Sequence, residues 1–156
     1  MIKPSAVVFD IDSTLADTMH RQDLILQGDE RENTDWLAYA RACGNDTPTA
    51  AVTLLKALAP YHHIVLLTSR PEGARAETEK WMIKHEVPFN ELIMDDYGKL
   101  STVAYKVENL RVLQARFDIK LLVEDSWNIR TKVEEELGIP TLVVRAYAPE
   151  ALELRY

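Results

Sequence analysis

The stretch that decides how this sequence is interpreted is Ala6-Val7-Val8-Phe9-Asp10-Ile11-Asp12-Ser13-Thr14-Leu15. Its first four residues are apolar, two of them β-branched, and they indicate a buried parallel strand over residues 6–9. Two aspartates follow, Asp10 and Asp12, and burying unpaired carboxylates costs several kcal/mol. Ligands of open α/β sheets bind beyond the carboxyl ends of the strands. We therefore expect both carboxylates to face a cleft.

The composition is that of a globular protein. With 156 residues, 47 % of them hydrophobic, the chain can form one domain with a sizeable core. No apolar run approaches the ~20 residues needed to cross a bilayer, and Met1 to Pro4 lead directly into the first strand. We therefore expect a cytoplasmic protein without a membrane partner. The single cysteine, Cys43, cannot form an internal disulfide.

The net charge of −7 argues against a broad surface for nucleic acid, because such a surface needs clustered lysine and arginine. It is compatible with a local basic pocket that binds one phosphate or the end of a strand.

After the first strand, strand patterns alternate with helix patterns. Strands are predicted over residues 62–67, 89–94, 120–123 and 140–144, and helices over 48–59, 70–85, 101–117 and 126–137. This alternation predicts an α/β fold, a Rossmann-like three-layer α/β/α sandwich with a mainly parallel five-stranded sheet. Trp81 and Met82 recur at helical spacing and are expected in the core.

Residues 17–44 are expected to form a small helical insertion between the first strand and the next strand-helix unit. Asp17 or Thr18 would begin one helix and Thr34 or Asp35 a second, with a charged loop over 28–33 between them. The insertion is too short for a separate domain but long enough to cover one side of a cleft. We expect residues 1–156 to form one domain.

Right-handed crossovers place the carboxyl ends of all parallel strands at one edge of the sheet. Polar residues that could carry chemistry follow the strands at that edge, and a lysine lies in the helix before the fourth strand. These residues are Asp10, Asp12, Thr68, Arg70, Glu124, Asp125 and Lys106.

Asp10 to Thr14 has the form DxDxT and resembles the first motif of the haloacid dehalogenase (HAD) superfamily of phosphotransferases. The family's later motifs, a hydroxyl, a lysine and an acidic pair, are matched in order by Thr68, Lys106 and Glu124-Asp125. Taken alone, DxDxT could be a capped turn in which Asp12 or Ser13 accepts from backbone N–H groups. The four motifs together cover nearly the whole chain and favour the family.

The resemblance implies a phosphomonoester hydrolase. Asp10 would be the nucleophile that becomes an aspartyl-phosphate, and Asp12 would act as general acid and then general base. Lys106 and the Thr68 hydroxyl would contact the phosphoryl oxygens.

The resemblance also implies a Mg²⁺ cofactor. Its ligands would be Asp10, the backbone carbonyl of Asp12, and Asp125, with Glu124 as the other acidic candidate.

Residues 17–21, 68–72 and 78–81 resemble, more narrowly, the 3′-phosphatase domain of phage-type polynucleotide kinase/phosphatases. This implies that Arg21 and Arg70 contact substrate phosphates, with Ser69 beside them as a further substrate-binding candidate. From the residues alone, Arg21 could equally be a solvated residue on a helix face. Arg70 could instead form an ion pair with Glu72 or a later acidic residue at the start of a helix.

Some features depart from the phage-type pattern. Residues 93–102 contain no arginine, the acidic pair begins with Glu124 rather than aspartate, and no GxxxxGK[ST] loop supports a kinase activity. The expected substrate is a nucleotide or the 3′-phosphate end of a nucleic acid. A phosphatase for a free nucleotide or small metabolite, which the acidic net charge favours, and a catalytically silent binding module are the alternatives. The presence of Asp10, Asp12, Lys106 and Asp125 argues against a silent module.

Overall fold

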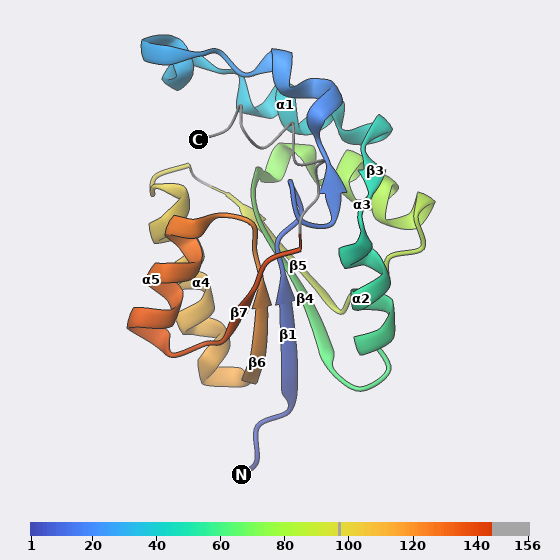
Figure 1. The fold of residues 1–156 in the computed structure, drawn as a ribbon, viewed down its shortest axis with the longest axis vertical. Helices are drawn as coiled ribbons and strands as arrows, with labels where there is room; N and C mark the ends of the chain where they lie inside the picture. The colour runs from blue at the N-terminus through green and yellow to red at the C-terminus, as the bar shows by residue number, and fades with distance from the viewer. Residues whose placement is uncertain (97, 145–156) are drawn as a thin grey trace.

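The structure, a computed structural model, describes residues 1–96 and 98–144, and its centre is a five-stranded sheet (Figure 1). The strands lie in the order β5-β4-β1-β6-β7, and every pairing in this sheet is parallel. They are β1 (Ser5–Phe9), β4 (His63–Pro71), β5 (Glu91–Asp95), β6 (Asp118–Val123) and β7 (Thr141–Leu142). The predicted five-stranded parallel sheet is confirmed, although β7 is shorter than the predicted 140–144.

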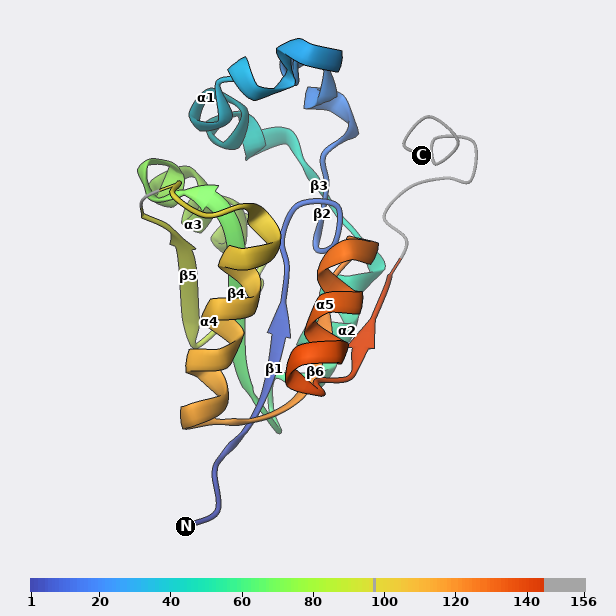
Figure 2. The ribbon, with the colours of Figure 1, turned by 90° about the vertical axis from the view of Figure 1, so that its left-hand side faces the viewer.

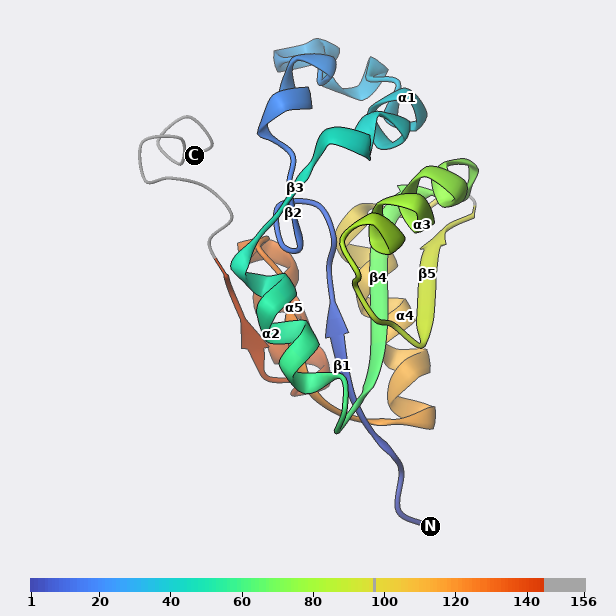
Figure 3. The same cartoon turned by 90° about the vertical axis from the view of Figure 1, so that its right-hand side faces the viewer.

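Alternate residues of β1 face two different helical layers. Val7 and Phe9 belong to a core cluster with α2 (Ala50–Leu58) and α3 (Arg75–Lys84). Ala6 and Val8 belong to a second cluster with α4 (Thr102–Arg116) and α5 (Trp127–Leu137). Figure 2 shows α4 and α5 on one face of the sheet, and Figure 3 shows α2 and α3 on the other. Because both faces are buried, β1 is a continuous apolar run, and the three-layer sandwich is confirmed.

The chain leaves the sheet after β1 and returns through a two-stranded antiparallel ladder. In this ladder β2 (Ala16–Asp17) pairs with β3 (Thr47–Pro48). We call residues 18–46, which lie between the two strands, the insertion. It contains 3₁₀ helices at Met19–Leu24, Gly28–Asn33 and Ala42–Asn45, and the short helix α1 (Trp36–Arg41). Figures 1 and 2 show it above the carboxyl ends of the sheet strands.

Several predicted boundaries were wrong. Thr47–Pro48 form β3 rather than a helix start, and the Thr49 hydroxyl caps α2 by accepting from the Ala51 N–H at 3.1 Å. The helix predicted from residue 70 begins as α3 at Arg75, because β4 continues through Pro71 and a 3₁₀ turn follows. The predicted charged loop over 28–33 is a 3₁₀ helix.

The two helices on the other face begin and end as predicted. Ser101 caps α4 and Ser126 caps α5, each accepting from the backbone N–H three residues later. Gly138 ends α5 with φ 64°, a left-handed conformation that favours glycine. In the described ranges, no helix combines the length and the apolar character needed to cross a membrane.

Candidate active site

A tight turn after β1 fixes the two aspartates of the first motif. The backbone N–H groups of Thr14, Leu15 and Ala16 all donate to the Ile11 carbonyl, at 3.2, 2.9 and 3.0 Å. Ser13 adopts φ 64°, which costs a residue with a side chain about 1–3 kcal/mol. Its N–H donates to the Ala16 carbonyl at 2.9 Å, so the strained conformation is held by the turn itself.

Asp10 is 7 % exposed and lies between a hydroxyl and an ammonium group. The Thr14 hydroxyl donates to its Oδ2 at 3.1 Å, and Lys106 Nζ donates to its Oδ1 at 2.6 Å. The same ammonium donates to the Leu67 carbonyl at 2.6 Å and to Glu124 Oε2 at 3.1 Å, which occupies all three of its N–H bonds. Burial by itself lowers the pKa of Lys106, but Asp10 and Glu124 outweigh burial and hold the pKa above its usual value. Lys106 is therefore a permanent cation in this site.

Three carboxyl groups converge at the ends of β1 and β6. Asp10, Glu124 and Asp125 each offer an oxygen within 4.8 Å of the others. Burial, and then the charge of Glu124, raise the pKa of Asp10 to about 7 although Lys106 opposes them. Burial, Asp10 and Glu124 raise the pKa of Asp125 to about 9. Burial and mutual repulsion therefore disfavour ionisation of all three groups beside a single ammonium. A divalent cation such as Mg²⁺, which these hard oxygen ligands fit, would offset that cost.

Asp12 is held by two arginines. Its Oδ2 accepts from Arg70 Nε at 2.9 Å, and its Oδ1 accepts from Arg70 Nη2 at 2.7 Å and Arg21 Nη2 at 2.5 Å. Burial by itself raises the pKa of Asp12, but Arg70 and then Arg21 outweigh burial and bring the pKa to about 2. Asp12 is therefore ionised at neutral pH, and its carboxylate lies outside the three-carboxyl cluster found among the described residues.

Asp46, which we did not predict as a site residue, binds both arginines. Its Oδ1 accepts from Arg21 Nε at 2.8 Å, and its Oδ2 accepts from Arg21 Nη2 at 2.7 Å and Arg70 Nη2 at 3.4 Å. His20 Nε2 lies 2.7 Å from Oδ1. Asp46 is only 1 % exposed, so this carboxylate is a buried counter-charge for the arginine pair.

The two alternative interpretations of the arginines do not hold. Arg21 is buried rather than solvated, and its Nη1 donates to the Tyr39 carbonyl at 2.8 Å. Arg70 lies in β4 and pairs with Asp12, whereas Glu72 pairs with Arg75.

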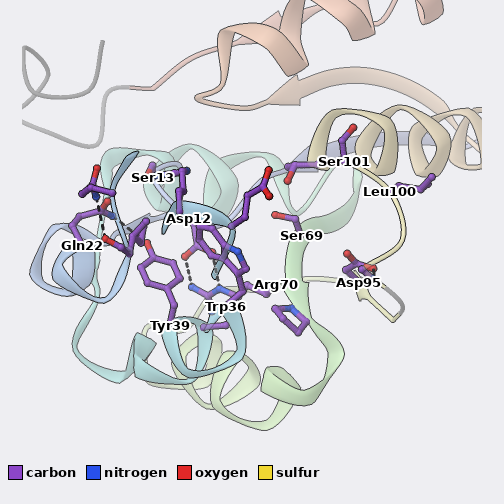
Figure 4. Close-up of a pocket in the computed structure, with 18 of the residues that line it drawn as sticks. Asp12, Ser13, Gln22, Trp36, Tyr39, Ser69, Arg70, Asp95, Leu100 and Ser101 are labelled. Carbon is purple, nitrogen blue, oxygen red and sulfur yellow. Dashed lines mark hydrogen bonds and ion pairs between the residues drawn. The ribbon is translucent and has the colours of Figure 1, made fainter. Parts of the chain in front are cut away.

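The second-motif residues Thr68 and Ser69 lie at the end of β4 in different environments. Thr68 is buried, and its hydroxyl oxygen accepts from the Arg70 N–H at 3.1 Å, which leaves the hydroxyl proton to donate elsewhere. Ser69 is exposed and lines a cavity of about 1210 Å³ between the insertion and the carboxyl edge of the sheet. Asp12 and Arg70 also line this cavity. In Figure 4, Gln22 and Tyr39 lie on one side of Asp12 and Arg70, and Ser69, Ser101 and Asp95 lie on the other.

A comparison with protein families identifies a match over most of the chain. The family model described as HAD superfamily, subfamily IIIB (acid phosphatase), matches residues 2–134. A search of curated proteins found no significant match.

Solved structures share the fold at low sequence identity. Two structures of the Pnkp1/Rnl/Hen1 RNA repair complex match at 21 % and 23 % identity, with TM-scores of 0.75 and 0.71. The match covers 91 % of this chain but only 46 % and 42 % of theirs, so this chain spans less than half of their length. A HAD family enzyme from Bacteroides thetaiotaomicron, in complex with magnesium and inorganic phosphate, matches at 16 % identity with a TM-score of 0.57. That match covers 97 % of this chain and 99 % of the other.

Proposed function

Because this chain belongs to the HAD superfamily, subfamily IIIB, we propose that it is a magnesium-dependent phosphomonoester hydrolase that forms an aspartyl-phosphate. The observation that carries the proposal is the placement of Asp10. Its carboxylate lies between the Thr14 hydroxyl and the Lys106 ammonium, at the carboxyl end of the central strand. Asp12 and Arg70 line the adjoining cleft, and the buried Arg21 binds Asp12 beside them.

In the first step, an Asp10 oxygen would attack phosphorus as the bond to the leaving oxygen breaks. The leaving oxygen takes the electron pair of that bond and needs a proton. In the second step, water would attack the phosphorus of the aspartyl-phosphate, release inorganic phosphate and restore the Asp10 carboxylate. Lys106 stays charged throughout and stabilises the negative charge of the phosphoryl oxygens.

We assign the proton transfers to Asp12. As an ionised carboxylate it is suited to accept the proton of the attacking water in the second step. For the first step it must carry a proton, which the two arginines oppose while they bind it. A substrate phosphate that takes over donors from Arg21 and Arg70 would weaken that opposition and allow Asp12 to act as the acid.

Asp10 and Asp125 would hold Mg²⁺, which supplies positive charge against the repulsion between Asp10 and the phosphate. We place Asp125 rather than Glu124 in direct contact with the metal because Asp125 is partly exposed, whereas Glu124 is buried and holds the Lys106 ammonium. Glu124 accepts from Lys106 at 3.1 Å and from the Ser126 N–H at 3.1 Å. Its role would be to position the lysine.

The proposed substrate is the 3′-phosphate end of a nucleic acid or a nucleotide. The proposal is supported by the resemblance to phage-type 3′-phosphatases and by the fold shared with a chain of the Pnkp1/Rnl/Hen1 RNA repair complex. The cavity of about 1210 Å³ is also larger than the ~300–1000 Å³ that a single small ligand usually occupies. The insertion would form one wall of this cleft.

The test is phosphate release with Mg²⁺ from a 3′-phosphorylated oligonucleotide, 3′- and 5′-mononucleotides and an aryl phosphate, beside the variant Asp10→Asn. Preference for the oligonucleotide, with an inactive variant, is the expected result. Equal or faster turnover of mononucleotides would make the protein a nucleotidase. No Mg²⁺-dependent turnover of any substrate would refute the catalytic assignment.

A further inference from the structure

The cleft has an aromatic wall on the side of the insertion. Trp36 and Tyr39 form this wall, and the Arg31 guanidinium lies over the Trp36 ring. We propose that Trp36 in this aromatic wall stacks against the nucleobase of the nucleotide that carries the phosphate. The inference rests on the proposed function and names the subsite that would select nucleic-acid ends over other phosphomonoesters.

Trp36 differs from the other exposed aromatic residues by its position. It is 39 % exposed and lines the cavity that Asp12 and Arg70 also line. Tyr61 and Trp127 are more exposed, but neither is among the described residues that line the cavity. A large aromatic surface beside a candidate catalytic group is typical of a stacking site for a planar ligand.

The indole of Trp36 is held in place before any ligand binds. The Tyr39 ring meets it nearly at a right angle, with ring centres 5.8 Å apart, and the Arg31 guanidinium lies 5.6 Å from the ring centre. Holding the ring in one orientation reduces the entropy lost when a base stacks on it.

A continuous set of contacts connects Trp36 to the reacting centre. The Arg21 guanidinium lies 4.2 Å from the centre of the Tyr39 ring, and the same guanidinium binds the Asp12 carboxylate at 2.5 Å. Trp36 is therefore separated from Asp12 by only two side chains, Tyr39 and Arg21. A phosphate at the arginines would leave the attached nucleoside next to the aromatic wall.

The charges of the cavity favour stacking over electrostatic attraction as the source of affinity. Its described lining contains two cations, Arg31 and Arg70, and three carboxylates, Asp12, Glu32 and Asp95. Arg70 is already paired with Asp12. Few cations remain for a phosphodiester backbone, so binding should depend weakly on salt and strongly on the aromatic surface.

The first experiment compares kcat/KM for two 3′-phosphorylated oligonucleotides, one complete and one lacking the terminal base. We expect Trp36→Ala to lower kcat/KM about tenfold on the complete strand, the effect of losing one stacked base. The same variant should behave like wild type on the strand without the base, and Trp36→Phe should retain most of the activity on both. Tyr61→Ala, a substitution outside the cavity, is the matched control and should change neither value.

The second experiment measures binding without turnover. In the Asp10→Asn background, the 3′-phosphorylated oligonucleotide should quench tryptophan fluorescence, and Trp36→Phe should remove that quenching although Trp81 and Trp127 remain. Equal losses on both strands with Trp36→Ala, or unchanged quenching with Trp36→Phe, would overturn the inference. Quenching that depends on Trp36, without hydrolysis of the strand by wild type, would refute the proposed function and leave the stacking site standing. If Trp36→Ala hydrolyses the strand as fast as wild type does, the stacking site is refuted and the proposed function stands.

Discussion

At the scale of single residues, Lys106 is the cation that pairs with the carboxyl groups of the candidate site. Its ammonium group is buried and donates to Asp10, Glu124 and the Leu67 carbonyl. Removing one partner of a buried ion pair is costly because the other partner keeps its charge without compensation, typically by about 3–5 kcal/mol.

We therefore predict that Lys106→Met lowers the free energy of unfolding by roughly 3–5 kcal/mol in metal-free buffer at pH 8. Urea denaturation measures this change. Lys132→Met is the matched control, because Lys132 makes an exposed ion pair with Glu136 at 2.9 Å and should barely move the urea midpoint. Similar small shifts for the two variants would contradict a stabilising role of the buried pairs that Lys106 makes with Asp10 and Glu124.

The carboxyl cluster also predicts a pH dependence for the metal-free protein. The pKa values of Asp10 and Asp125, about 7 and about 9, lie above their ordinary value of 3.8. Between the ordinary value and each raised value, the folded state therefore binds more protons than the unfolded state. Their contribution to stability is complete below the unfolded pKa and is lost as the pH rises through the folded values. The melting temperature in EDTA should therefore fall as the pH rises from about 5 to about 9.

Mg²⁺ should oppose this fall because it binds the deprotonated carboxylates. The increase in melting temperature on adding Mg²⁺ should grow with pH. Asp125→Asn should reduce both this increase and the fall of the metal-free melting temperature with pH. A metal-free melting temperature that is constant or rises over this range would contradict the assignment of the cluster.

At the scale of elements, local patterns predicted the strands and helices better than their ends. The burial of β1 on both faces is visible as an apolar run, and Ser101, Ser126 and Gly138 are local capping signals. The ends of β3 and β4 depend on distant partners instead. Thr47–Pro48 pair with Ala16–Asp17, and Pro71 at the end of β4 pairs with Asp95 of β5. No local sequence signal encodes these pairings.

The end of α5 provides a prediction at this scale. Gly138 has φ 64°, so Gly138→Ala should lower the free energy of unfolding by about 1 kcal/mol, because a Cβ is strained in the left-handed region. Gly44→Ala is the control, since Gly44 has no positive φ and no atom lies within 4 Å of an added Cβ. A loss in urea stability for Gly44→Ala as large as that for Gly138→Ala would argue against backbone strain as the cause.

At the scale of the whole molecule, Asp46 joins the insertion to strand β4 and to helix α3. Its carboxylate binds Arg21 of the insertion and Arg70 of β4, and its carbonyl accepts from Trp81 Nε1 of α3 at 2.8 Å. The position of the aromatic wall relative to Asp12 therefore depends on this buried residue.

We predict that Asp46→Asn lowers the free energy of unfolding by about 3 kcal/mol or more, because two buried guanidinium groups lose a counter-charge. The value of kcat/KM should fall as well, since Arg21 and Arg70 lose a fixed orientation. Asp118→Asn, at an exposed residue that pairs with Lys120, is the control for urea denaturation and kinetics. If both variants behave like wild type, Asp46 does not organise the site.

The topology explains which site residues could be predicted. Parallel strands bring Asp10, Thr68 and Glu124 to one edge of the sheet whatever the details of packing, so their proximity follows from the sequence. Asp46 could not be found in this way, because it meets Arg21 and Arg70 only through the path of the insertion. The burial of Arg21 also depends on the path of the insertion. It could not be predicted, because the 3₁₀ helix Met19–Leu24 that carries Arg21 shows no apolar periodicity.

The most direct test of the central claim is to locate the covalent intermediate. A phosphomonoester that wild type turns over would be mixed with the protein and Mg²⁺, quenched rapidly in acid, and the digested protein analysed by mass spectrometry. The account predicts a transient phosphoryl group on the peptide that contains Asp10, absent from Asp10→Asn. Turnover with no phosphorylated peptide at any quench time, or with the phosphoryl group on another residue, would contradict it.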